Sequence, residues 1–160
     1  MRILRYLFLA SAVVFILLQI IYYPQMPNTV AIHFNSNGQV NGWMSRDLNL
    51  IMSCVIIVII TSSFFGAPYI AKSVTGDLIN VPHKEYWLSA NNKERLIEII
   101  SIYLYSIGLV TNIFMIFLFH QLYKYNIHAI NEVFIIAIVP FLIIIFGFTI
   151  HLIIRLNKCA

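Results

Sequence analysis

The chain has 160 residues, of which 61% are hydrophobic and 10% are charged, with a formal net charge of +4 at pH 7. Soluble domains usually carry about 25% charged residues, so this composition excludes an ordinary soluble fold. The length is that of a single domain covering residues 1–160, and the few basic residues form no dense patch of the kind that binds nucleic acid. We therefore expect an integral membrane protein whose partner is the lipid bilayer and not a nucleic acid.

Four apolar stretches are long enough to cross the hydrocarbon core of a bilayer, which takes about 20 residues of helix. The predicted helices cover residues 4–23, 48–70, 96–119 and 133–154. The predicted connections are an outer loop at residues 24–47, an inner loop at residues 71–95 and a second outer loop at residues 120–132. The sequence thus predicts an all-α membrane protein, a bundle of four transmembrane helices.

The first apolar stretch follows two arginines, Arg2 and Arg5, and this start resembles a signal peptide. However, the apolar run is longer than the core of a typical signal peptide, and no small-residue cleavage pattern precedes Pro24. We expect the segment to be retained as the first helix.

Lysine and arginine are distributed unevenly between the two predicted sides of the membrane. One side would hold Arg2, Arg5, Lys72, Lys84, Lys93, Arg95, Arg155 and Lys158. The other side would hold Arg46 and Lys124. Because short basic loops stay in the cytoplasm, we predict a multi-pass protein of the cytoplasmic (plasma) membrane with both termini inside the cell. The positive net charge then reflects topology and contact with anionic lipid.

The first outer loop, residues 24–47, contains a predicted β-hairpin. Residues 29–34 alternate β-branched and other side chains, as a short strand does. Asn37 and Gly38 come next, and this pair is typical of a tight hairpin turn. Trp43 precedes the second helix, where a tryptophan serves either as an interface anchor or as part of a binding surface. The predicted fold is therefore a four-helix bundle with a short extracytoplasmic hairpin between its first two helices.

The same loop resembles a bacterial membrane-protein family. The residues that carry the resemblance are Pro24, Pro27, His33, Phe34, Asn35, Gly38, Gly42, Trp43 and Arg46. They look like the motif of an uncharacterised membrane domain that also forms the N-terminal half of SdpI-type toxin-immunity proteins. Val40 and Asn41 stand where that family usually has proline and aspartate, and Arg46 stands for its usual lysine. A second stretch, residues 80–87, is similar to the cytoplasmic loop of many members.

This resemblance implies a binding role. SdpI-type proteins protect a cell from a secreted peptide toxin and relay the toxin's presence to a cytoplasmic repressor, and they carry additional helices beyond four. By this resemblance, the residues expected to bind an extracytoplasmic peptide or small ligand are His33, Phe34, Asn35, Gly38, Gly42, Trp43 and Arg46. The residues expected to face a cytoplasmic or membrane protein partner are Asn80, Pro82, Tyr86 and Trp87.

Three histidines on the predicted outer side, His33, His120 and His128, are candidates for metal binding. Imidazole is a common zinc ligand, and His33 is the best placed of the three because it lies within the motif. No HExxH pattern accompanies them, and histidines at helix ends also meet water without any metal. We therefore predict no metal site and no cofactor.

On the third helix, five residues with polar or small side chains fall within about 80° of one another around the helix axis. They are Glu98, Ser101, Tyr105, Gly108 and Asn112. We expect this face to point into the bundle, where small and amide side chains allow close packing and interhelical hydrogen bonds. A path for a substrate is the alternative interpretation.

The sequence contains no phosphate-binding glycine loop, nucleophile elbow or CxxC pair, so we do not expect an enzyme. The first functional hypothesis is a receptor-type or immunity-type signalling protein that binds a ligand at its outer hairpin. The second is a component of a transporter, working as a homo-oligomer. The third is a structural accessory subunit of a membrane complex.

Overall fold

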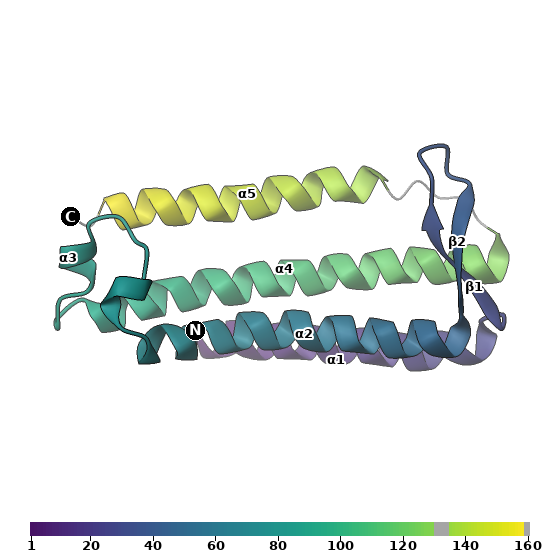
Figure 1. Ribbon diagram of the computed structural model, residues 1–160, viewed down its shortest axis with the longest axis horizontal. Coiled ribbons are helices and arrows are strands. Elements are labelled where there is room, and N and C mark those ends of the chain that lie inside the picture. The colour runs from purple at the N-terminus through teal and green to yellow at the C-terminus, as the bar shows by residue number, and fades with distance from the viewer. Residues whose placement is uncertain (130–134, 159–160) are drawn as a thin grey trace.

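The computed structural model describes residues 1–129 and 135–158, and four long helices dominate it (Figure 1). They are α1 (Arg2–Tyr22), α2 (Arg46–Ser73), α4 (Lys93–His128) and α5 (Ile135–Asn157). Each contains a segment long enough and apolar enough to cross a membrane. Together with the composition, this makes the chain a multi-pass membrane protein, as the sequence predicts.

Short elements lie at the two ends of the bundle. The hairpin end carries η1 (Tyr23–Gln25), β1 (Thr29–Phe34) and β2 (Val40–Ser45). The opposite end, here called the loop end, carries η2 (Gly76–Leu78) and α3 (Lys84–Trp87). Both chain termini lie toward the loop end (Figure 1).

The two strands form an antiparallel hairpin, which confirms the prediction for this loop. Thr29 pairs with Ser45 and Ala31 with Trp43, with irregularities on either side of His33. Gly38 has a φ of 75°, in the left-handed region that favours glycine, so it supplies the turn.

The side chain of Asn35 closes the hairpin turn. Its Oδ1 accepts hydrogen bonds from the backbone N–H groups of Asn37, at 3.0 Å, and Gln39, at 2.9 Å. Asparagine is common in turns because its short side chain can bond to the backbone two residues ahead.

The bundle core is built where α1, α2 and α4 meet. Gly108 lets the helices approach closely, because a Cβ at this position would lie 2.7 Å from the ring of Phe8 and 3.0 Å from Cβ of Phe64. Asn112 is 0% exposed, and its Nδ2 donates to Ser11 Oγ on α1 at 3.1 Å. Amide and small residues therefore hold these helices together, as expected for helices packing within a membrane.

The predicted inward face of the third helix is correct except at one end. Ser101, Tyr105, Gly108 and Asn112 are buried, whereas Glu98 is exposed. The expectation for Glu98 is wrong because its position lies at the edge of that face, where a charged side chain can turn outward and keep its solvation.

The third long helix extends further than its hydropathy indicates. The sequence places residues 120–132 in a loop, but residues 120–128 continue α4, and residues 130–132 lie outside the described part of the chain. With 36 residues, α4 is about 54 Å long, which exceeds the roughly 30 Å hydrocarbon core. Its last turns contact α1 and the hairpin, and these contacts support the helix beyond the apolar stretch.

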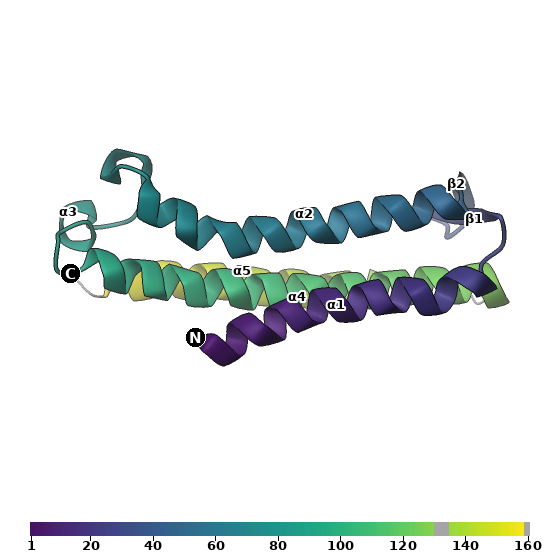
Figure 2. The same ribbon diagram turned by 90° about the horizontal axis from the view of Figure 1, so that it is seen from below.

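The fourth long helix, α5, packs along α4 (Figure 1). The rings of Phe114 and Phe141 stack with their centroids 4.0 Å apart, and Tyr103 OH is hydrogen-bonded to His151 Nδ1 at 2.7 Å. Figure 2 shows α1 and α2 drawing closer together toward the hairpin end. The candidate site lies where they converge.

Candidate ligand site at the hairpin end

The hairpin is fixed to the end of α4 by one asparagine. Asn126 Oδ1 accepts from the backbone N–H of Ala31 at 2.7 Å, and Asn126 Nδ2 donates to the carbonyl oxygen of Ala31 at 3.0 Å. The amide thus bonds to both backbone groups of Ala31, as a neighbouring strand would. The ring of Phe34 also meets Tyr125 of α4 edge to face, with centroids 4.8 Å apart. These contacts set the position of the hairpin over the helices.

Several motif residues have clear structural roles within the hairpin. His33 Nδ1 lies 2.5 Å from Asn41 Oδ1 on the opposite strand. Gly42 faces His33 so closely that a Cβ at Gly42 would lie 2.8 Å from His33 Cβ. Trp43 is 61% exposed, which suits either of its two predicted roles. Contact with a ligand stays a prediction for six motif residues of the hairpin: His33, Phe34, Asn35, Gly38, Gly42 and Trp43.

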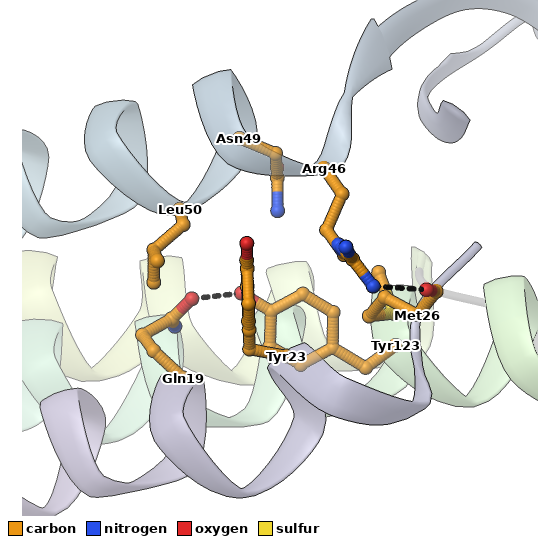
Figure 3. A pocket seen from close by; sticks show the side chains of 7 residues that line it. All are labelled: Gln19, Tyr23, Met26, Arg46, Asn49, Leu50 and Tyr123. Carbon is orange, nitrogen blue, oxygen red and sulfur yellow. Dashed lines mark hydrogen bonds between the residues drawn. The ribbon is translucent and has the colours of Figure 1, made fainter. Parts of the chain in front are cut away.

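Beside the hairpin, a small recess opens between the ends of α1, α2 and α4 (Figure 3). Seven residues, called here the recess residues, line it: Gln19, Tyr23, Met26, Arg46, Asn49, Leu50 and Tyr123. Its empty volume is about 190 Å³, including the part open to solvent. The enclosed part has room for about one water molecule. Arg46 is the one predicted ligand-binding residue among these seven.

A hydrogen-bonded group from three helices forms the inner wall of the recess. Gln19 Oε1 on α1 accepts from Ser53 Oγ on α2 at 2.9 Å and from the hydroxyl of Tyr123 on α4. Gln19 is only 2% exposed, and its side chain faces Tyr123 in Figure 3. The other end of this amide, Gln19 Nε2, has no hydrogen-bond acceptor among the residues that the structure describes.

Arg46 forms the outer wall and is held by three contacts. Its Nη1 donates to the carbonyl oxygen of Met26 at 3.2 Å, and its guanidinium lies over the ring of Tyr23, 4.5 Å from the centroid. Asp47 Oδ1 accepts a hydrogen bond from Tyr23 OH at 2.7 Å and lies 3.8 Å from Arg46 Nε. That last distance is too long for a hydrogen bond. Arg46 Nε is therefore a second buried donor without an acceptor in the described part of the chain.

Two of the side chains that line the recess therefore carry buried donors without an acceptor in the described part of the chain. Buried donors are nearly always satisfied in folded proteins, and leaving one unpaired costs about 1–3 kcal/mol. Gln19 Nε2 and Arg46 Nε are two such donors from different helices, and both side chains line one recess. This arrangement suits a ligand group that accepts hydrogen bonds.

The three candidate metal ligands are not gathered into one site. His33 is paired with Asn41 on the hairpin, and His120 Nδ1 is hydrogen-bonded to Tyr22 OH at 2.8 Å. His128 is the last residue of α4. Within residues 1–129 and 135–158, no three His, Cys, Asp or Glu side chains are placed to hold a metal ion.

At the loop end, the residues expected to face a partner differ in exposure. Asn80 and Tyr86 are exposed and Pro82 is half-buried. Trp87 is 0% exposed, and its indole Nε1 donates to the carbonyl oxygen of Leu156 on α5 at 3.0 Å. Trp87 is therefore part of the protein core at this end and cannot offer its ring to a partner in this conformation.

Sequence reasoning missed most of the recess. Gln19 is the only amide in the first apolar stretch, and a polar group in such a helix can mark function, so this signal was available. Tyr123 gave no such signal, because its contact with Gln19 joins residues 104 positions apart.

Residues 10–59 match the model of a family described as a domain of unknown function (DUF1648). The matched segment runs from α1 through the hairpin into α2 and includes every recess residue except Tyr123. No curated protein and no solved structure matches the chain. Over this segment the chain is similar to an uncharacterised family, in agreement with that part of the predicted resemblance, and the match carries no link to SdpI-type proteins.

Proposed function

We propose that this protein is a small receptor-type membrane protein that binds a ligand at its hairpin end. The recess carries the proposal, because the side chains of Gln19 and Arg46 line it and each holds a buried donor that has no acceptor among the described residues. A concave site with a few converging polar groups is the usual form of a ligand site. The proposed role is binding rather than catalysis. The motif suggests an immunity-type function, protection from a secreted peptide, and this would be one form of ligand binding.

In this proposal the hairpin end faces the outside of the cell. Of the ten lysine and arginine residues of the chain, Arg46 and Lys124 belong to the hairpin end, and the remainder belong to the termini and the loop end. Such a bias favours a cytoplasmic loop end with both termini inside. A ligand would then reach the recess from outside the plasma membrane.

A signal could pass from the recess through the helices that form it. A ligand bound to Gln19, Arg46 and Tyr123 would contact α1, α2 and α4 at once. The same three helices meet again deeper in the bundle around Asn112, and α4 then continues to the buried Trp87 cluster. Ligand binding changes the loop end only if the ligand has different affinities for two arrangements of these helices. The exposed side chains of Asn80 and Tyr86 would present that change to a protein partner.

The test is to purify the protein from its own membrane in mild detergent and identify bound species by native mass spectrometry. Wild type is compared with Arg46→Gln, and with Lys124→Gln as a control that removes one positive charge from the same end. We expect a species that wild type and the control retain and that Arg46→Gln loses.

Equal retention by all three proteins would contradict the proposal, and so would the absence of any bound species. A scaffold or transport function would then be the better explanation, and ligand-dependent flux in proteoliposomes would favour transport.

A further inference from the structure

We propose that the recess binds a carboxylate group, whose oxygens accept hydrogen bonds from Gln19 Nε2 and Arg46. The inference rests on the proposed function, because it names the ligand class of the same site. Three properties of the recess support it: the type of its free hydrogen-bonding groups, its charge and its size.

The free groups are donors, so the ligand must supply acceptors. Within residues 1–129 and 135–158, Gln19 Nε2 and Arg46 Nε have no acceptor, whereas the hydroxyl protons of Tyr23 and Tyr123 are already donated to Asp47 and Gln19. An amine or another cationic group would bring further donors to a site that has them in excess. The two donors therefore favour a ligand that accepts hydrogen bonds over a cationic ligand.

The charge of the recess favours an anion. Among the seven recess residues, Arg46 is cationic and none is acidic. The nearby Asp47 side chain is 74% exposed and already accepts from Tyr23, so water and this hydroxyl solvate its charge. Because water screens the exposed Asp47 carboxylate, its attraction for Arg46 Nε at 3.8 Å is weakened, and Arg46 keeps attraction for a second anion. Hydrogen bonds to an ionised acceptor are roughly twice as strong as those between neutral groups.

The size of the recess admits one small group, and the planar shape of a carboxylate favours it over a phosphate. The enclosed part takes about one water-sized group, so a single oxygen enters while the rest of the ligand stays at the mouth. A carboxylate is planar and matches the donor fork of a guanidinium. A phosphate is tetrahedral and presents more oxygens than two free donors can satisfy.

The experiment measures thermal unfolding of the detergent-solubilised protein in a buffer without carboxylates. Acetate is titrated against chloride at equal pH and ionic strength, and trialanine with a free C-terminus is compared with its C-terminal amide. We expect Tm to rise with acetate and with the free peptide but not with chloride or the amide, because a ligand that binds the folded state stabilises it. Tighter binding of the free peptide than of acetate would identify a peptide terminus as the source of the carboxylate, and equal binding would identify a small free acid.

Variants separate a specific site from general attraction. Arg46→Gln should weaken acetate binding by about tenfold or more, the loss of one hydrogen bond to a charged group. Arg46→Lys keeps the charge but not the Nε donor, and we expect it to bind acetate less well than wild type. Lys124→Gln should bind acetate as wild type does.

The inference would be overturned by equal stabilisation with acetate and chloride, or by equal weakening of acetate binding in Arg46→Gln and Lys124→Gln. Stabilisation by inorganic phosphate but not by acetate would also overturn it. If mass spectrometry then found an Arg46-dependent ligand without a carboxylate, only the ligand class would be wrong. If it found none, the proposed function would fail as well.

Discussion

Replacing Asn126 by leucine should release the hairpin from the bundle. The native amide bonds to both backbone groups of Ala31, which is 0% exposed. Leucine has the same branched shape but no hydrogen-bonding group, so the N–H and C=O of Ala31 would remain buried without partners. Each such group costs about 1–3 kcal/mol, which gives a loss of at least about 2 kcal/mol in hairpin docking. That energy corresponds to an increase of about 30-fold in the undocked population.

Hydrogen exchange of the Ala31 amide measures this population directly, because that N–H donates to Asn126. We expect exchange at Ala31 to accelerate by about 30-fold in Asn126→Leu, with unchanged exchange in α3 and the first turns of α4. Asn126→Asp is the comparison variant, since it keeps an acceptor for the Ala31 N–H and replaces the donor to the carbonyl by a second, charged acceptor. It should give a smaller acceleration. Unchanged exchange at Ala31 in the leucine variant would refute the role of Asn126 in holding the hairpin.

Three further predictions concern the fold and its orientation. Gly42→Ala places a Cβ against His33 Cβ, and the shift that this forces should destabilise the hairpin by about 1–3 kcal/mol. The loss should appear as faster amide exchange in residues 29–34, and exchange at the wild-type rate would contradict the prediction. Gly108→Val drives a side chain into the ring of Phe8, so the free energy of unfolding should fall by about 1–3 kcal/mol and Tm in detergent should fall with it. An unchanged Tm would count against the close packing of α1 and α4. In a cysteine-free background, Asn37→Cys at the hairpin turn should react with a membrane-impermeant maleimide in intact cells; labelling only after lysis would reverse the proposed orientation.

Much of the fold follows from local patterns along the sequence. The four membrane helices appear as apolar runs, and the hairpin follows from strand alternation and the Asn37-Gly38 pair. The continuation of α4 to His128 could not be found in this way, because hydropathy falls where the helix leaves the lipid core. That segment is held by contacts distant in sequence, such as Asn126 with Ala31.

The candidate site was only partly predictable for the same reason. Arg46 lies in a recognisable motif, but its burial against Tyr23 and Met26 depends on how η1 folds back on α2. Gln19 and Tyr123 become a site only when α1 and α4 pack side by side. Trp87 shows the opposite case, because an aromatic residue in a charged loop suggests a surface anchor, whereas this ring fills the core at the loop end.

The central claim is that Gln19 and Arg46 bind a ligand together in the recess, and side-chain NMR tests it most directly. The Nε2 resonances of Gln19 and the Nε resonance of Arg46 are followed in isotope-labelled protein during an acetate titration, with the Asn126 side-chain amide as an internal control. We predict that the Gln19 and Arg46 resonances shift together and saturate at one acetate concentration, while Asn126 stays unchanged. If neither donor responds, or if all three groups drift without saturation, the recess is not a ligand site of the kind proposed.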